Sequence, residues 1–272
     1  MVLVTGAARR VGRAIALELA AHGFDLALHS HQTSAEAAET RSEALLLGAR
    51  AEVFAADLAD ESACRALLPA VVESMGRCDA VVNNASRFEY DGIEDFKPAS
   101  LAAHLQVNTV APLLLAQALH AHLGGSGHGS DSVSVNGNGN GNGHGRQGCV
   151  VNLLDQKLWN PNPDHLSYTL SKAALAAATT LLAQALAPSV RVVGVAPGIT
   201  LPSGPMSEHE FDRARRMTPL GYSCSAEDVA KAVRFLIESR AITGTTLLVD
   251  GGQHLLAQPR DVLYLARAEA SK

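Results

Sequence analysis

The sequence predicts a single α/β domain built on a Rossmann-type, doubly wound parallel sheet of seven strands. Short runs rich in β-branched residues alternate with longer segments of helical period along most of the chain. A glycine-containing turn joins the first such run to the first helical segment. The 272 residues, 47% of them hydrophobic, can bury one sizeable core. This alternation is typical of βαβ units and a parallel sheet.

The elements follow one another in a regular order. We expect strands at residues 2–5, 25–29, 51–55, 80–83, 149–154, 190–196 and 245–249. Helices are expected at residues 11–22, 35–47, 61–75, 101–123, 167–186 and 226–239. Together they form a nucleotide-binding domain at residues 1–254, and residues 255–272 are a tail of no readable role.

Residues 124–148 interrupt this rhythm, because ten of the twenty-five are glycine. Such a segment has almost nothing to bury, so we expect a disordered surface insert. It joins a helix to a strand, which places it opposite the ligand crevice of a doubly wound sheet. His128 and His144 could chelate a metal weakly, but ordering glycine is costly and we expect no metal site.

Composition excludes several classes of function. A net charge of -5 gives no basic surface for nucleic acid. The four scattered cysteines form no CxxC pair, which favours a reducing cytoplasm over a disulfide framework. We expect no signal peptide and no membrane-spanning segment.

The turn after the first strand can hold a pyrophosphate. It reads Thr-Gly-Ala-Ala-Arg-Arg-Val-Gly, with Gly6, Arg9, Arg10 and Gly12 as the expected contacts. Glycine allows close backbone approach, and the N-terminus of the following helix attracts anions. A glycine turn alone is a weak signal, but here strand, turn and helix stand in the required order.

The end of the second strand favours NADPH over NADH. His29, His31, Gln32 and Thr33 stand where an NAD-selecting site usually carries an acid. These groups, with the nearby arginines of the turn, would accept a 2′-phosphate. The alternative is an ordinary strand end with solvated imidazoles.

Two further strand ends carry polar side chains. Asp57, next to Leu58, follows the third strand, and Asn84, Ala85 and Ser86 follow the fourth. Ligands gather at such C-terminal strand ends in this fold, so we expect these residues at the cofactor. A helix cap for Asp57 and a simple turn for the asparagine are the alternatives.

Tyr168 and Lys172 lie one helical turn apart and therefore project from the same face. A nearby ammonium favours the phenolate, so we expect a lowered pKa for Tyr168 and a role as proton donor. The same spacing is common in surface helices. The pair therefore gains its meaning from its context.

In order and over nearly the whole chain, the glycine turn, Asn84-Ala85, Asn108, Tyr168 with Lys172, and Pro197-Gly198 resemble the short-chain dehydrogenase/reductase family. The resemblance implies that Tyr168 is the acid/base, that Lys172 holds the ribose and that Asn108 supports a proton-relay water. Thr200 could bond the cofactor or the substrate, or merely cap a loop.

Two departures from the family pattern point to one of its branches. Asp155 stands where the family usually has serine, thirteen residues before Tyr168, and Arg10 replaces a motif glycine. With Ser86 and Phe88, these residues resemble the pteridine and dihydromonapterin reductases. That resemblance implies a pterin stacked on Phe88, a substrate site of Arg10, Ser86, Phe88, Asp155 and Tyr168, and a homotetramer.

The chemistry of Asp155 supports the same interpretation. Reduction of a C=N bond must also protonate nitrogen, which a carboxyl beside a phenol can relay. Asp155 could instead merely form an ion pair. We therefore predict NADPH-dependent reduction of a dihydropterin, and of oxidised pterin or dihydrofolate by extension. A ketone or 3-oxoacyl reductase and a silent NADPH-binding sensor are the alternatives. Residues 201–219 are expected to fold over the site as a lid.

Overall fold

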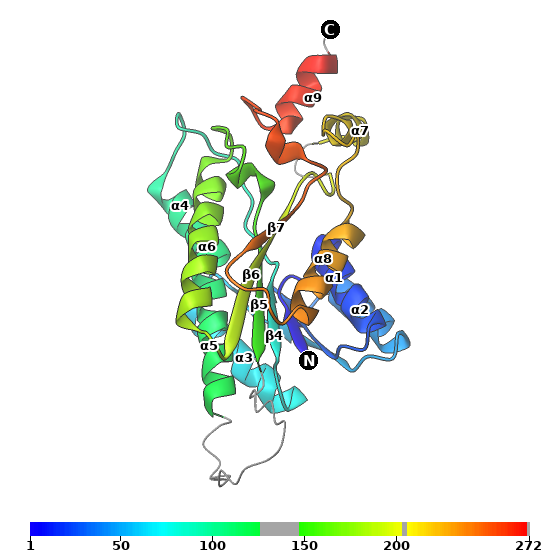
Figure 1. Ribbon diagram of the computed structural model, residues 1–272, viewed down its shortest axis with the longest axis vertical. Helices are drawn as coiled ribbons and strands as arrows, with labels where there is room; N and C mark the ends of the chain where they lie inside the picture. The colour runs from blue at the N-terminus through cyan, green and yellow to red at the C-terminus, as the bar shows by residue number, and fades with distance from the viewer. Residues whose placement is uncertain (126–146, 203–205, 271–272) are drawn as a thin grey trace.

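The computed structural model describes residues 1–125, 147–202 and 206–270 (Figure 1). Its centre is a parallel sheet with the strand order β3-β2-β1-β4-β5-β6-β7, which confirms the predicted seven-stranded, doubly wound architecture. The strands are β1 (Val2–Val4), β2 (Leu26–Ser30), β3 (Ala51–Ala55), β4 (Ala80–Asn83), β5 (Gly148–Leu153), β6 (Val190–Pro197) and β7 (Thr246–Val249). Each lies within one residue of its predicted bounds.

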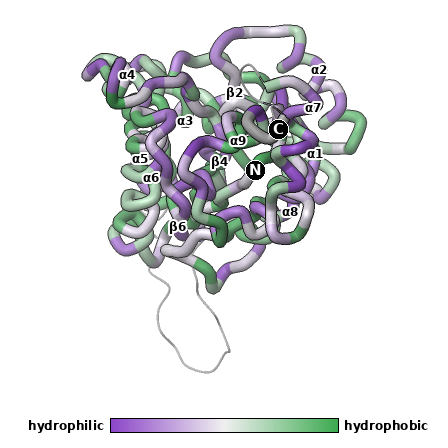
Figure 2. Tube along the Cα trace, turned by 90° about the horizontal axis from the view of Figure 1, so that it is seen from above, coloured by the Kyte–Doolittle hydropathy of each residue, from purple (hydrophilic) through white to green (hydrophobic). Residues whose placement is uncertain are grey.

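Helices cover both faces of the sheet. Viewed from above, α3, α4, α5 and α6 lie on one side and α1, α2 and α8 on the other (Figure 2). The helices are α1 (Arg10–Ala21), α2 (Ala35–Leu46), α3 (Glu61–Met75), α4 (Pro98–Leu105), α5 (Ala111–Gly125), α6 (Leu166–Ala185), α7 (Glu208–Arg216), α8 (Ala226–Glu238) and α9 (Val262–Ala270).

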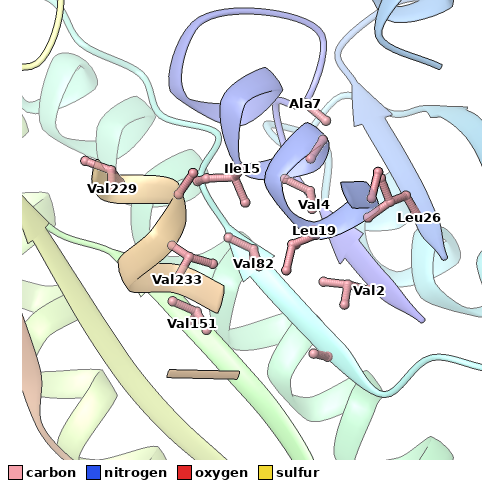
Figure 3. Packing of buried hydrophobic residues seen from close by; sticks show 14 of the residues in the cluster. Val2, Val4, Ala7, Ile15, Leu19, Leu26, Val82, Val151, Val229 and Val233 are labelled. Atoms are coloured by element: carbon pink, nitrogen blue, oxygen red, sulfur yellow. The ribbon is translucent and has the colours of Figure 1, made fainter. Parts of the chain in front are cut away.

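Alternating strand residues feed two apolar layers. Val2 and Val4 pack with Ile15 of α1 and Val233 of α8 (Figure 3). Leu3, between them, packs on the other face with residues of α3 and α5. Successive side chains of a strand point to opposite faces. Because helices cover both, β1 is buried throughout.

The predicted helix at residues 101–123 starts earlier and contains a π-helical turn, η1 (Gln106–Val110), between α4 and α5. Pro98 suits the first helical position because its missing N–H is not needed there. The run from residue 98 to 124 is also long and apolar enough to span a membrane, which we did not expect from the sequence. Its α5 portion packs on α3, β4 and β5 as a core helix does.

The predicted lid contains a helix. Ser207 and Glu210 form a capping box at the start of α7, and Glu208 lies in the first turn while arginines occupy the last. Both features stabilise a short charged helix. Ala214 of α7 packs against Val262 of α9, which lies in the predicted tail.

The two edges of the sheet, at the N-terminal and the C-terminal ends of its strands, carry different parts of the chain. The ends of α5 and β5 that flank residues 126–146 lie away from α7 and α9 (Figure 1). Residues 126–146 of the predicted insert, His128 and His144 included, lie outside the described residues, whereas Gly125 and Gly148 at its two ends belong to α5 and β5. The C-terminal ends of β1 and β4, adjacent strands from the two halves of the sheet, mark the switch point at which this type of sheet binds its ligands.

Candidate active site

The turn between β1 and α1 requires glycine at two positions. Gly6 has a φ of 64°, a conformation that side chains disfavour. A Cβ on Gly12 would lie 2.1 Å from the Gly6 carbonyl oxygen. Arg9, the N-cap residue, gives no side-chain capping bond within the described part of the chain. The first N–H groups of α1 therefore remain able to bind an anion.

Asn84 fastens this turn to the end of β4. Its Nδ2 donates to the carbonyl oxygens of Thr5 at 2.9 Å and Gly6 at 3.2 Å. In return, the Thr5 hydroxyl accepts from the backbone N–H groups of Asn84 and Ala85 at 2.9 and 3.0 Å. The turn is thus held from both sides by hydrogen bonds to the end of β4.

His29 does not point where the sequence analysis placed it. Its Nδ1 accepts from the Gly6 N–H at 3.1 Å, and its Nε2 lies 3.0 Å from the Ala56 carbonyl oxygen. A neutral ring protonated on Nε2 satisfies both bonds, and burial lowers the pKa of His29. The ring is only 2% exposed, so the expectation that it contacts a phosphate is wrong for its side chain.

The neighbours of His29 are open to a ligand. His31, Gln32 and Thr33 are exposed after β2. The His31 Nδ1 lies 3.4 Å from a carboxylate oxygen of Asp57, which also accepts from the Ala59 N–H at 2.9 Å. The helix cap considered as the alternative for Asp57 is wrong, because Asp60 is the N-cap of α3. Asp57 caps only the turn that precedes this helix.

Leu58 contributes differently from Asp57. Its side chain is buried in the apolar layer of α3 and α5, so it could face a cofactor only through its backbone.

Arg10 adopts the conformation of the glycine it replaces. Its φ is 56°, which costs a residue with a side chain about 1–2 kcal/mol. The exposed guanidinium donates to the Pro202 carbonyl oxygen at 2.9 Å. Arg10 therefore links the turn to the segment that follows β6.

Asp155 and Tyr168 form the hydrogen bond on which the candidate site depends. The Tyr168 hydroxyl donates to Oδ2 of Asp155 at 2.8 Å, while Oδ1 accepts from the Lys157 N–H at 2.8 Å. Lys172 Nζ donates to the Leu153 carbonyl oxygen at 2.7 Å and lies 5.7 Å from the centre of the Tyr168 ring. β5 and α6 thus place an acid, a phenol and an ammonium in one pocket.

Burial shifts all three of these groups towards their neutral forms. It raises the pKa of Asp155, and it lowers the pKa of Lys172 to about 8. Burial and the Asp155 carboxylate together raise the pKa of Tyr168. The expected lowering of the Tyr168 pKa by Lys172 is therefore wrong, because both the burial and the closer charge act the other way.

Asn108 lies in the π-helical turn and braces the neighbouring loop. Its Oδ1 accepts from the Arg87 N–H at 2.7 Å and from the Ser86 hydroxyl at 3.2 Å. Its Nδ2 donates to the Arg87 carbonyl oxygen and to Ser171 Oγ, both at 2.9 Å. The Asn108 side chain is thus fully engaged, and any water it supports must be held by its backbone.

Phe88 stands against the proposed proton donor. Its ring meets the Tyr168 ring edge-on at 4.7 Å and stacks on His165 at 4.4 Å. It is nevertheless 42% exposed, so it is not a core residue. One side of the ring remains able to hold a planar ligand.

Thr200 is occupied locally. Its hydroxyl donates to the Gly198 carbonyl oxygen at 3.0 Å and lies 3.2 Å from Cys224 Sγ. A Cβ on Gly198 would approach Asp250 to 2.8 Å, so this position after Pro197 requires glycine. Loop capping is the interaction that the structure shows for Thr200.

The sequence analysis missed Asp91, which caps α6 from a distant loop. One carboxylate oxygen accepts from the Ser167 N–H at 2.9 Å and the other from the Ser167 hydroxyl. The Asp91 carbonyl oxygen also accepts from the Leu166 N–H at 3.0 Å. A polar loop residue gives no signal of a partner 76 positions away, so only the fold reveals this role.

The described residues contain no cluster of metal-ligating side chains. Within residues 1–125, 147–202 and 206–270, no three His, Cys, Asp or Glu side chains gather as metal ligands.

Comparison with known proteins gives one family match that covers most of the chain. The model for "short chain dehydrogenase" matches residues 1–213. The protein named "Granaticin polyketide synthase putative ketoacyl reductase 2" from Streptomyces violaceoruber is 33% identical, over 93% of this chain and 96% of the relative. Pteridine reductase 1 from Leishmania tarentolae is 31% identical, over 93% and 96%.

A solved structure is also similar to this chain. FolM alternative dihydrofolate reductase 1 from Brucella canis, complexed with NADP, superimposes with a TM-score of 0.80. It is 36% identical, and the match covers 94% of each chain.

Proposed function

Because the chain belongs to the short-chain dehydrogenase family, we propose that it reduces a dihydropterin with hydride from NADPH. The observation that carries this proposal is the 2.8 Å hydrogen bond between Tyr168 and Asp155. In a ketone reductase the proton goes to an oxygen, for which a phenol suffices. A carboxyl coupled to that phenol suits delivery of a proton to a ring nitrogen.

The protonation states fit a donor role. Reduction of a C=N bond needs hydride at carbon and a proton at nitrogen, and NADPH supplies the hydride when bound. The raised pKa of Tyr168 keeps its hydroxyl protonated but makes it a weaker acid, so transfer of its proton requires Lys172, whose Nζ lies 5.7 Å from the ring centre, to stabilise the phenolate that forms. After the Tyr168 proton moves to nitrogen, the Asp155 carboxyl, reloaded from solvent, returns the phenolate to its neutral form.

The residues at the crevice fit a dinucleotide. Gly12 and the uncapped first turn of α1 would hold the pyrophosphate. Arg9 and Arg10 are exposed, as are His31, Gln32 and Thr33, and these groups would receive a 2′-phosphate. Asn84, Ala85, Ser86 and Gly198 would line the remaining crevice. NADP in the Brucella canis reductase supports this choice of cofactor.

Phe88 would bind the substrate. A pterin between its ring and the nicotinamide would stack on an aromatic face and lie beside Tyr168. Lys172, by its family role, would hold the ribose and so fix the nicotinamide against that pterin.

A ketone or 3-oxoacyl reductase is the second candidate. The Streptomyces violaceoruber ketoacyl reductase favours it, because that relative is similar over nearly its whole length. In this case Asp155 would only accept the Tyr168 hydrogen bond and would not be needed for turnover.

A screen of NADPH oxidation separates the two candidates. It uses dihydrobiopterin, dihydromonapterin, dihydrofolate, quinonoid dihydropterin and simple ketones with the purified full chain. We expect turnover of dihydropterins. Turnover of ketones alone would establish the second candidate, and tight NADPH binding with no turnover would establish a silent sensor.

Asp155→Ser tests the assigned role directly. We expect it to lower kcat for a dihydropterin about 100-fold while NADPH affinity stays unchanged. Asp25→Ser, an exposed carboxylate before β2, is the matched control and should change neither. Equal losses of turnover and of cofactor affinity would contradict the proton-relay role.

Assembly and location follow the family resemblance. We propose a cytoplasmic homotetramer, which light scattering of the purified chain would test. Exposed Leu170 and Leu181 on α6 are apolar surface of the kind that an interface covers.

A further inference from the structure

Residues 156–165, which we call the connecting segment, join Asp155 at the end of β5 to α6, the helix that carries Tyr168. Their placement therefore sets how the two members of the proposed relay lie relative to each other. The segment is itself held by residues close to the C-terminus. The Gln258 N–H donates to Oδ1 of Asn160 at 3.1 Å. Residues beyond the last strand thus contact the part of the chain that links the two relay groups.

Asp164 is the second point of attachment. Its buried carboxylate accepts from Nε and Nη2 of Arg260, each at 2.8 Å in its shortest contact, and from the Asp261 N–H at 2.7 Å. Its carbonyl oxygen accepts from the Nζ of Lys157. Asp164 therefore joins Lys157, near the start of the connecting segment, to the residues that precede α9.

Lys157 is a buried cation with no part in the proposed mechanism. It is only 5% exposed, and its Nζ lies 4.0 Å from a carboxylate oxygen of Asp261. Its backbone N–H is the donor that holds Oδ1 of Asp155. An ammonium removed from water is costly unless opposite charges accompany it. Two carboxylates supply that charge to Lys157, namely Asp261 before α9 and Asp155 at the candidate site.

The charges of this cluster act on the relay in opposite directions. Burial raises the pKa of Asp155, whereas the Lys157 ammonium lowers it. Burial and the Asp155 carboxylate raise the pKa of Tyr168, and the Asp261 carboxylate raises it further. The ionisable groups around Asp155 and Lys157 come from several parts of the chain: Tyr168 and Lys172 on α6, Asp164 in the connecting segment, Asp261 before α9, and His254 on η3 (Gln253–Leu255), which packs on η2 (Gln156–Leu158).

We propose that Lys157 is a positioning residue whose ammonium stabilises the negative charge of the Asp155–Tyr168 pair during proton transfer. The inference rests on the proposed function for its place in catalysis. When the Tyr168 O–H bond breaks and the proton moves to the ring nitrogen, the electron pair stays on the phenolate oxygen. Lys172 offsets this charge from α6, and Lys157 offsets it from the connecting segment. The Asp261 carboxylate neutralises part of the Lys157 ammonium and so limits its effect.

Two variants that break the same ion pair from opposite sides test the inference in the full chain. The alkaline limb of kcat for dihydrobiopterin, along which the relay loses its proton, reports the apparent pKa of the Asp155–Tyr168 pair. Lys157→Met should raise this pKa by about one pH unit, and Asp261→Asn should lower it because Lys157 is then unopposed. Asp261→Asn keeps the cap of α9, because asparagine also accepts from the Leu263 N–H, which Asp261 binds at 3.1 Å.

The Asp155 carboxyl can also be titrated directly, without substrate. In protein labelled with ¹³C at the aspartate side chains, the Asp155 resonance is identified by its absence from Asp155→Asn, and its pKa should move in the same two directions. Lys231→Met, which removes an exposed lysine of α8, is the matched control and should change neither measurement. Asp261→Asn decides alone if Lys157→Met fails to fold.

A structural role and an electrostatic role of Lys157 give different results. Loss of the ion pair from either side would weaken the fold alike, so a structural role predicts a lower kcat in both variants with an unchanged pKa. That result, shifts in the same direction, or no shift in Asp261→Asn would overturn the inference. Opposite shifts of the Asp155 resonance with no turnover of any pterin would overturn the proposed function and leave the action of Lys157 on Asp155 standing.

Discussion

The turn between β1 and α1 and the pocket of Asp155, Tyr168 and Lys172 lie at the same edge of the sheet but are built in opposite ways. In the turn, small residues let backbone groups meet, and Gly12 fits directly against Gly6. In the pocket, ionisable side chains are buried, with Tyr168 8% and Lys172 3% exposed. The turn depends on shape, and the pocket depends on charge.

The difference teaches where each region is vulnerable. Adding an atom to the turn forces the backbone apart, so cofactor binding should fail first. Removing a polar atom from the pocket leaves the shape intact but disturbs proton transfer, so turnover should fail first.

Tyr168→Phe should give the largest effect and the sharpest separation. Loss of the hydroxyl removes the proton donor, and kcat should fall by about 10²–10⁴-fold, while NADPH affinity measured by fluorescence titration stays near that of the wild type. A large loss of NADPH affinity would mean that the Tyr168 hydroxyl also determines the shape of the cofactor site.

Gly12→Ala should have the opposite effect, a loss of NADPH affinity. The added Cβ would meet the Gly6 carbonyl oxygen at 2.1 Å, and the resulting backbone shift should cost about 3 kcal/mol in the free energy of unfolding. We expect NADPH affinity to fall at least about 100-fold. Calorimetry and titration measure the two effects, and unchanged affinity would contradict the assignment of the turn.

Asp91→Ala should lower both stability and turnover, although Asp91 does not itself contact Asp155, Tyr168 or Lys172. The buried N–H and hydroxyl of Ser167 lose their acceptor, which should cost about 2 kcal/mol of stability, and displacement of Tyr168 should lower kcat about tenfold. Asp95→Ala removes an exposed carboxylate that accepts from the Gly92 N–H at 2.7 Å and is the control. Equal effects of the two variants would contradict a positioning role for Asp91.

Burial of Lys172 should make the free energy of unfolding depend on pH. Its pKa is lowered from 10.5 to about 8 by burial, so between these values the unfolded chain binds more protons than the folded one. The free energy of unfolding contributed by Lys172 must therefore rise with pH across this window, and its full penalty is present below pH 8. Urea titrations of wild type and Lys172→Met should diverge there, and parallel curves would refute the shift.

Arg10→Gly should give the smallest effect, and its sign is informative. Removing the side chain from a left-handed conformation should raise stability by about 1 kcal/mol while weakening NADPH affinity. A stability loss would show that the bond to the Pro202 carbonyl oxygen outweighs the backbone strain.

Regular patterns made most of the fold predictable from the sequence. Strand bounds agree within one residue because buried parallel strands are continuous apolar runs. The helix α7 lies in a segment predicted as a lid loop, because its mostly charged sequence has few apolar positions. The helix α9 lies in the tail beyond the last strand, for which no structure was predicted. Both helices depend on packing against each other, which no local pattern records.

The candidate site was predictable only where a motif specifies it. The structure brings Asp155, Tyr168 and Lys172 together as their spacing suggested. The inward direction of His29 and the capping role of Asp91 could not be foreseen. Each depends on a backbone group that only the folded chain brings near.

The π-helical turn at Gln106–Val110 makes the site depend on a count of residues as well as on their identities. A single deletion there would restore the ordinary period and remove the wide turn that holds Asn108. Asn108, whose Oδ1 accepts from the Arg87 N–H at 2.7 Å, would then no longer brace the loop that carries Phe88. A chain shortened by that one residue could keep Asp155, Tyr168 and Lys172 and still lose their alignment with the substrate.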